Sequence, residues 1–209
     1  MKTLYLNSGQ MDVAADLLKQ GEVVGFPTET VYGLGVVYDN PLAFSRLVKA
    51  KNRPENKPFT LMCGYLEDIK KVAVVDDRTE RIIEKFMPGA ITLLLEKKDG
   101  LPDWVTLGSP FVGVRISSHP LVLSVIRKVQ KPLLVPSANL AGEPPLSLYK
   151  EVQDVFDGKI AAIFKEDSSG QKPSTIVKIN GNQLECVREG AIPFQEIKKV
   201  WEASLWKLL

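Results

Sequence analysis

Gly25-Phe-Pro-Thr-Glu-Thr-Val-Tyr-Gly-Leu-Gly35 is the most informative stretch of the sequence. It continues an apolar strand predicted over 22–26 and then opens a loop rich in hydroxyl side chains. Loops on rigid scaffolds often carry function, and Gly33 and Gly35 indicate a backbone that turns sharply or approaches another group closely. A purely structural connection explains the same pattern equally well, so the loop alone does not decide its role.

Helical and strand patterns alternate along the rest of the chain. Helices are predicted over 11–19, 41–50, 79–86, 121–128, 147–156 and 194–206, with Ser8 and Asn40 as caps of the first two. Further strands are predicted over 59–63, 90–95, 111–116, 133–135, 160–164, 175–179 and 184–187. The alternation predicts an α/β fold with a mixed sheet whose last strands pair antiparallel.

Composition and charge narrow the class of protein. The 209 residues are 44% hydrophobic and no Pro/Gly/Ser-rich linker divides them, which predicts a single domain over 1–209. The first residues lack the apolar core of a signal peptide, and no apolar run reaches membrane-spanning length. Cys63 and Cys186 lie in apolar runs and are expected to be buried free thiols. We therefore expect a cytoplasmic protein without membrane contact.

A net charge of +2 is too small to indicate nucleic-acid binding by itself. The single histidine, His119, excludes a multi-histidine metal site within one chain, and it is expected to cap or begin the helix after it. Two common nucleotide-binding patterns are also absent: Tyr38 replaces the third Rossmann glycine, and Gly170–Thr175 lacks the Gly-Lys-Ser/Thr ending of a P-loop. A nucleotide would have to be bound by a motif other than these two.

A cluster of four cations follows the second predicted helix. They are Lys49, Lys51, Arg53 and Lys57. Basic residues at a helix end can simply complement the dipole. Pro54 and Pro58 would instead hold Arg53 and Lys57 rigidly for phosphate, each contact being worth about 4 kcal/mol at 4 Å and an effective dielectric of about 20. Lys51 and Arg53 are expected to be exposed, and both interpretations stay open.

Polar side chains also stand at the ends of later strands. Arg115 either pairs with a carboxylate or receives one from a substrate. Ser137 and Asn139 can shape a turn. Ser174 and Arg188, taken alone, are a strand-edge hydroxyl and a surface arginine.

Together these motifs resemble the YrdC family, the L-threonylcarbamoyladenylate synthases. The resemblance extends over about 11–192 and rests on Pro27–Gly35, Lys51-Asn-Arg53, Ser137-Ala-Asn139, Pro173–Val177 and Val187–Gly190. It implies a twisted mixed sheet with a concave basic groove, similar to the DHBP synthase fold.

The resemblance also implies an activity. Members of this family are nucleotidyltransferases that join L-threonine, bicarbonate and ATP into threonylcarbamoyl-AMP and release pyrophosphate. Mg²⁺ is expected on the ATP phosphates, with no ligand set from the protein alone. The product serves t6A modification at adenosine 37 of tRNA, which implies a partner threonylcarbamoyl transferase; direct RNA binding stays open.

Residue roles follow from the resemblance alone. The implied catalytic tetrad comprises Lys51, Arg53, Ser137 and Asn139 around the triphosphate. Further implied ATP contacts are Lys57 and Arg188, and implied threonine contacts are Thr30, Arg115 and Ser174. Two positions depart from the family: Phe111 replaces a hydroxyl residue expected to contact ATP, and Met62 replaces a polar residue near threonine. Strict amino-acid specificity is therefore open.

Two alternatives remain at this point. One is a carbamoyl-adenylate-forming enzyme of the hydrogenase-maturation type, although the acylphosphatase-like and zinc-finger modules usually fused to it are not in this sequence. The other is an RNA-binding module that uses the basic face, for which salt-dependent RNA binding without pyrophosphate release would be diagnostic.

Overall fold

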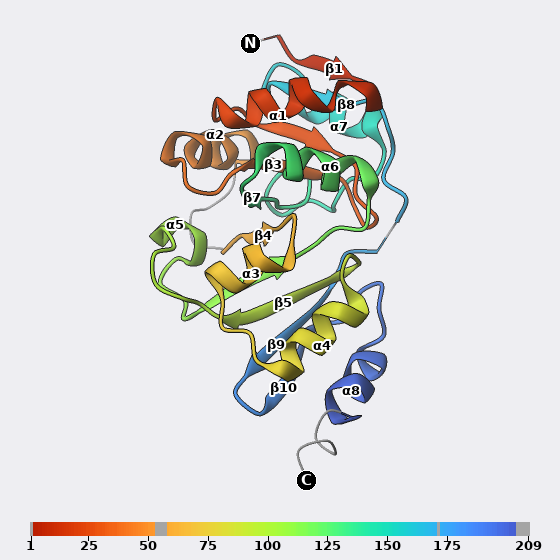
Figure 1. Ribbon diagram of the computed structural model, residues 1–209. Coiled ribbons are helices and arrows are strands. Elements are labelled where there is room, and N and C mark those ends of the chain that lie inside the picture. Colours follow the sequence, from red (N-terminus) through yellow and green to blue (C-terminus); the bar gives the residue numbers. More distant parts are fainter. Residues whose placement is uncertain (1, 53–57, 171, 204–209) are drawn as a thin grey trace.

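The computed structural model describes residues 2–52, 58–170 and 172–203. Within them a ten-stranded sheet extends from β1 at one end of the molecule to β10 near the other (Figure 1), in the order β1-β8-β2-β3-β7-β4-β6-β5-β9-β10. The strands are β1 (Leu4–Leu6), β2 (Val24–Phe26), β3 (Gly33–Val37), β4 (Thr60–Met62), β5 (Ile91–Glu96), β6 (Phe111–Arg115), β7 (Leu133–Leu134), β8 (Ala162–Phe164), β9 (Thr175–Asn180) and β10 (Gln183–Arg188).

The sheet is mixed, as predicted. β2 runs parallel to β8 but antiparallel to β3, with Val24 opposite Gly35. β4 and β6 are parallel, β5 and β9 are parallel, and β9 and β10 close the sheet as an antiparallel pair. The predicted antiparallel ending is therefore confirmed.

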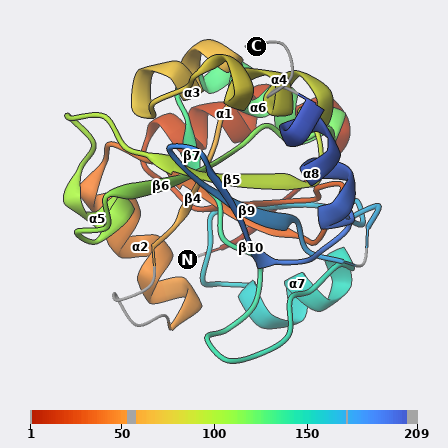
Figure 2. The same cartoon turned by 90° about the horizontal axis from the view of Figure 1, so that it is seen from below.

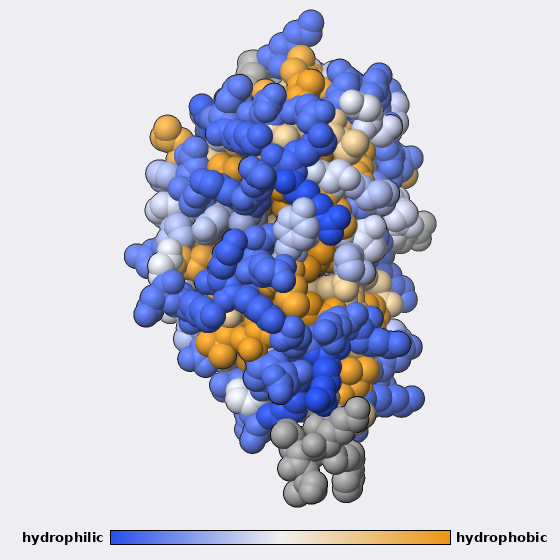
Figure 3. Space-filling model, viewed as in Figure 1, coloured by the Kyte–Doolittle hydropathy of each residue, from blue (hydrophilic) through white to orange (hydrophobic). Residues whose placement is uncertain are grey.

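Helices cover both faces of the sheet. They are α1 (Met11–Lys19), α2 (Pro41–Lys51), α3 (Leu66–Val72), α4 (Asp77–Phe86), α5 (Asp103–Thr106), α6 (Pro120–Val129), α7 (Tyr149–Phe156) and α8 (Phe194–Ala203). Figure 2 shows α1, α3, α4 and α6 on one side of the sheet and α7 on the other. The face that carries the first group is mostly hydrophilic, with scattered hydrophobic patches (Figure 3). None of the helices described is long and apolar enough to cross a membrane.

Helix starts were only partly predictable. Asn40 Oδ1 accepts hydrogen bonds from the backbone N–H of Leu42 and Ala43, and Pro41 begins α2, as expected. Ser8 is not the cap of α1, because Asn7 caps a short 3₁₀ turn, Ser8–Gln10, that comes first. The predicted last helix extends to 206, and its final residues lie outside the described part of the chain.

Besides this 3₁₀ turn, two strands and two helices were missed: β1, β3, α3 and α5. β3 contains Gly33 and Gly35, and glycine is depleted in strands. The predicted close approach is nevertheless confirmed. A Cβ on Gly33 would lie 2.7 Å from Val135 Cγ1, and one on Gly35 would lie 2.6 Å from the Phe26 ring. These glycines let β3 pack tightly beside β2 and β7.

The two cysteines are free thiols, as predicted. Cys63 is buried after β4, but Cys186 is only half-buried on β10, so the expectation of burial was wrong for Cys186. The reason is that β10 is an edge strand whose outer side has no neighbour among the described strands.

Candidate functional site

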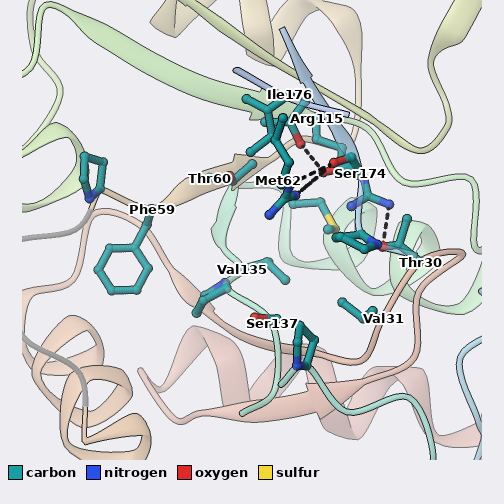
Figure 4. A pocket seen from close by; sticks show the side chains of 16 residues that line it. Thr30, Val31, Phe59, Thr60, Met62, Arg115, Val135, Ser137, Ser174 and Ile176 are labelled. Carbon is teal, nitrogen blue, oxygen red and sulfur yellow. Dashed lines mark hydrogen bonds between the residues drawn. The ribbon is translucent and has the colours of Figure 1, made fainter. Parts of the chain in front are cut away.

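A cavity of about 190 Å³ lies at one edge of the sheet (Figure 4). Strand directions bring its walls together: β4 and β6 end there, β5 and β9 begin there, and β10 ends there. Met62 and Arg115 are direct neighbours at the ends of β4 and β6. The polar residues that the sequence placed at strand ends are thus gathered by topology.

Five of the predicted site residues line this cavity: Thr30, Arg115, Ser137, Ser174 and Arg188. Lys51 and Asn139 stand behind the Ser137 wall and contact it. Arg53 and Lys57 lie outside the described residues. The wider basic groove stays a prediction.

The loop after β2 is held by its own hydroxyl groups. Thr28 Oγ1 donates to the Val31 carbonyl at 2.6 Å, accepts from the Thr30 N–H at 3.1 Å and lies 2.9 Å from Thr30 Oγ1. Both threonines are buried. The loop is further tied to the chain after β8, where the Thr28 N–H donates to Ser168 Oγ. Thr30 therefore reaches the cavity from a rigid support.

Arg115 ends β6 and is 6% exposed. Its Nη2 lies 2.9 Å from Glu29 Oε1 and donates to Thr30 Oγ1 at 3.0 Å, while Nε donates to the Gly89 carbonyl at 3.2 Å. Nη1 has no hydrogen-bond partner among the described residues, and the side chain borders the cavity. Arg115 thus pairs with a protein carboxylate and still has Nη1 to offer a ligand.

Glu29 is a site residue that the sequence analysis missed. Its carboxylate accepts from Arg115, from Ser117 Oγ and from the Ser118 N–H at 3.0 Å. Burial by itself raises the pKa of Glu29, but the Arg115 charge and these hydrogen bonds outweigh it and hold the pKa below its usual range. Glu29 is therefore ionised at neutral pH. The available signal was an acidic residue between two threonines in an otherwise apolar stretch.

Lys51 differs from expectation, because its side chain is 1% exposed. Its Nζ donates to the carbonyl of Ser137, to the carbonyl of Asn139 at 2.6 Å and to Asn139 Oδ1 at 3.3 Å. The helix extends one residue further than predicted and ends at a left-handed Asn52. Lys51 therefore follows Leu47 by four residues on the buried face of α2.

Ser137 and Asn139 form the turn that Lys51 holds. Ser137 Oγ donates to Asn139 Oδ1 at 2.6 Å, and the Asn139 amide donates to the carbonyls of Leu140 and Glu143. The turn-shaping role expected from their residue types is confirmed, and Ser137 also lines the cavity.

A second cluster joins β5, β9 and β10. Thr92 Oγ1 lies 2.9 Å from Ser174 Oγ, and Arg188 donates to the Ser174 carbonyl from Nη2 at 2.9 Å and from Nε at 3.2 Å. Partial burial of its guanidinium and the charge of Arg115 both lower the pKa of Arg188. Thr92 was missed because one threonine in an apolar strand resembles ordinary core sequence.

Comparison with known proteins identifies the family. The Sua5/YciO/YrdC family model, described as telomere recombination, matches residues 16–190. The chain belongs to the Sua5/YciO/YrdC family.

Curated relatives of this family cover most of the chain. It is 37% identical over 202 residues to the threonylcarbamoyl-AMP synthase of Bacillus subtilis, covering 94% of this chain and 58% of that protein. It is 32% identical to a putative threonylcarbamoyl-AMP synthase of Methanocaldococcus jannaschii, and the match covers 95% of this chain and 96% of that protein. The chain thus spans less than two thirds of the Bacillus relative's length but nearly all of the other.

The solved structure of P. abyssi Sua5 complexed with L-threonine superposes with a TM-score of 0.88. It is 30% identical to this chain and covers 96% of it, while the chain covers 61% of that protein. The mixed α/β architecture is therefore that of the Sua5/YciO/YrdC family.

The two departures from the family pattern lie in different places. Met62 lines the cavity beside Arg115. Phe111 is not among the lining residues, and its ring packs 4.4 Å from Lys178 Nζ. Of these two residues, Met62 is therefore the one placed to contact a ligand in this cavity.

His119 occupies the position before α6 but makes no capping hydrogen bond with its side chain. Its Nε2 lies 3.5 Å from Glu166 Oε1, and Nδ1 is buried without a partner. Burial lowers the pKa of His119 in spite of the nearby carboxylates. It is the N-cap position that leads into the helix, as expected, and is not among the cavity-lining residues.

The charged side chains that line the cavity are all positive among the described residues. Among the described lining residues the charged ones are Arg115 and Arg188, and none of these residues carries a carboxylate. The described part of the chain also holds no group of three or more His, Cys, Asp or Glu residues placed to bind a metal ion. The arrangement suits an anionic ligand with hydrogen-bonding groups.

Proposed function

We propose that this chain is an L-threonylcarbamoyladenylate synthase, a nucleotidyltransferase that joins L-threonine, bicarbonate and ATP into threonylcarbamoyl-AMP and releases pyrophosphate. Family membership and the names of its relatives support this proposal. The observation that carries it is the cavity, where two arginines and several hydroxyl groups meet and no carboxylate stands among the described lining residues. A solved relative complexed with L-threonine has the same fold.

The cavity offers a seat for threonine. Arg115 would bind the substrate carboxylate through Nη1, since Nη2 already contacts Glu29 and Thr30 and Nε donates to the Gly89 carbonyl. Thr30 Oγ1 and Ser174 Oγ would orient the amine and the side-chain hydroxyl. Both hydroxyls are already fixed by hydrogen bonds, which lowers the entropy lost on binding.

The chemistry needs no nucleophile from the protein. The threonine amine would attack the bicarbonate carbon to form a carbamate with loss of water, and a carbamate oxygen would then attack the α-phosphate. Pyrophosphate leaves with the bonding electrons. Catalysis is then positioning and charge stabilisation.

The triphosphate would lie outside the cavity, against the Ser137–Asn139 turn. Lys51 would act by holding this turn, because its ammonium is committed to the carbonyls of Ser137 and Asn139. Arg53 and Lys57 remain the proposed direct phosphate contacts. Mg²⁺ would arrive on the ATP phosphates, as it commonly does. Of the two side-chain oxygens of the turn, Ser137 Oγ keeps lone pairs for it, whereas Asn139 Oδ1 already accepts from Ser137 and Lys51.

The product would pass to a threonylcarbamoyl transferase that modifies adenosine 37 of tRNA. We place the reaction in the cytoplasm, where such tRNA is modified. Direct tRNA binding is not required by this arrangement.

The proposal is tested by pyrophosphate release with purified protein. L-threonine, bicarbonate, ATP and Mg²⁺ are each omitted in turn, and release is expected only with all four. Release supported by carbamoyl phosphate without an amino acid would favour a carbamoyl-adenylate former. Salt-dependent RNA binding without any turnover would favour an RNA-binding module.

A further inference from the structure

The segment 189–192, which follows β10, packs against the backbone of the cavity wall that carries Ser174. Gly190 makes the closest contact. A Cβ on Gly190 would lie 2.3 Å from the Pro173 carbonyl oxygen and 2.6 Å from the Ser174 carbonyl oxygen. Both are backbone atoms, and Cβ atoms keep at least 3.0 Å from their neighbours. A side chain at position 190 would therefore require the backbone of the wall to shift.

Thr175 ties this segment to the wall. Its Oγ1 donates to the Ile192 carbonyl and accepts from the N–H groups of Gly190 at 3.0 Å and Ile192 at 3.1 Å. These three bonds use the donor and both lone pairs of a hydroxyl group. The Ala191 N–H also donates to the Pro173 carbonyl at 3.0 Å. Because Thr175 is fully buried, water cannot easily replace its bonds.

The side chain of Thr175 lies on the opposite side of the strand from the cavity. Neighbouring side chains of a strand point to opposite faces. Ser174 and Ile176, on either side of Thr175, both line the cavity, whereas Thr175 is not among the described lining residues. Thr175 can therefore influence a ligand in this cavity only through the residues that it holds.

Two cavity-lining side chains depend on the placement of the Ser174 backbone. Ser174 Oγ lies 2.9 Å from Thr92 Oγ1, and the Ser174 carbonyl accepts from Arg188 Nη2 at 2.9 Å and Nε at 3.2 Å. Figure 4 shows Ser174 beside Arg115. A shift of the Ser174 backbone therefore moves both its hydroxyl and the acceptor that orients Arg188.

We infer that Thr175 and Gly190 are positioning residues for the amino-acid substrate, because together they fix the Ser174 hydroxyl in the cavity through the 189–192 segment. This inference rests on the proposed function, in which Ser174 Oγ orients L-threonine. A group that is fixed before binding loses less entropy when the ligand arrives. Small displacements of such a group are costly, since a misplacement of about 1 Å can lower a rate about a hundredfold.

The first test compares two glycine-to-alanine variants of the full chain. Gly190→Ala requires the Pro173 carbonyl oxygen to retreat from 2.3 Å to at least 3.0 Å, and it should lower kcat/KM for L-threonine about tenfold or more. Gly181→Ala is the matched control. Gly181 lies in the β9–β10 turn, where the added Cβ has no described atom beyond its chain neighbours within 4 Å. Its φ of 54° makes alanine destabilising, but the cavity wall stays in place, so kcat/KM should not change.

The second test removes the hydroxyl group without adding atoms. Thr175→Val keeps the shape of the side chain but leaves two N–H groups of the 189–192 segment without their acceptor. It should raise the KM for L-threonine about tenfold, because the wall is no longer tied in place. Thr175→Ser keeps the hydroxyl and loses a buried methyl group, so it should be less stable than wild type but retain nearly the wild-type KM.

Melting curves and calorimetric titration with L-threonine alone accompany both tests. If Gly190→Ala does not fold, the two Thr175 variants decide. Wild-type affinity for L-threonine in Thr175→Val would overturn the inference. Equal losses of affinity in Thr175→Val and Thr175→Ser, or in Gly181→Ala and Gly190→Ala, would also overturn it, since the effect would then follow stability. Wild-type protein that neither binds L-threonine nor releases pyrophosphate would refute the proposed function, and the inference with it.

Discussion

Replacing Lys51 by alanine should destabilise the protein, although lysine substitutions are usually harmless at a surface. The side chain is 1% exposed, and its ammonium donates to two carbonyls and one amide oxygen of the Ser137–Asn139 turn. Each hydrogen bond to a charged group is worth about 1.5–3 kcal/mol, and losses within one cluster do not add fully. We therefore expect Lys51→Ala to lower the free energy of unfolding by about 3 kcal/mol. For a chain of this size that corresponds to a drop of about 6–12 °C in Tm.

The assay is thermal and urea unfolding without ligands. Lys49→Ala is the matched control, because Lys49 lies on the same helix but is exposed. An exposed substitution of that kind should change stability by less than about 0.5 kcal/mol. Lys51→Met keeps the apolar stem and removes only the donor, so it should remain clearly less stable than wild type.

Equal melting temperatures for Lys51→Ala and Lys49→Ala would refute this reasoning. Lys51 would then not be required to hold the turn, and its ammonium would be available to a ligand. Loss of activity with unchanged stability would restore the direct phosphate contact that the sequence alone predicts.

Two further predictions concern the Arg115–Glu29 pair. Arg115→Ala should weaken L-threonine binding about tenfold or more while ATP binding changes little, because a charge-assisted bond to the substrate carboxylate is lost; separate calorimetric titrations measure both, and an equal loss for the two ligands would contradict the assignment. Glu29→Gln should make the free energy of unfolding depend less on pH in the acid range. The folded-state pKa of Glu29 is lowered, so its stabilisation is present above the unfolded-state pKa of about 4.3 and disappears as pH falls through the folded-state value. Urea unfolding at pH 7 and at successively lower pH should show a larger loss for wild type than for the variant, and parallel losses would rule out this linkage.

Much of the architecture could be predicted because local signals agreed with the tertiary structure. Asn40 and Pro41 mark the start of α2 by capping chemistry alone. The strands that line the cavity are apolar runs with a polar residue at one end, and Arg115 was found for that reason. β3 was missed because its two glycines serve a packing contact with Phe26 and Val135 that no local pattern reveals.

The site was harder to predict than the fold, because its geometry depends on contacts between residues distant in sequence. Lys51 was expected to be exposed, since nothing in its neighbourhood shows that the 137–139 turn will cover it. Glu29 went unnoticed because its partners, Arg115 and Ser117, come more than 80 residues later. Arg188 was assigned by resemblance, and only the fold shows that it shares a cavity with Arg115.

The most direct test of the proposed synthase activity follows the carbon of bicarbonate into the product. The protein is incubated with L-threonine, ATP, Mg²⁺ and ¹³C-bicarbonate, with carbonic anhydrase present to equilibrate the pool, and the nucleotide fraction is analysed by mass spectrometry. The proposed synthase activity should yield an AMP adduct that contains threonine and one labelled carbon, formed in equal amount with pyrophosphate. A nucleotide fraction without labelled carbon, or a labelled adduct that forms without threonine, would contradict it.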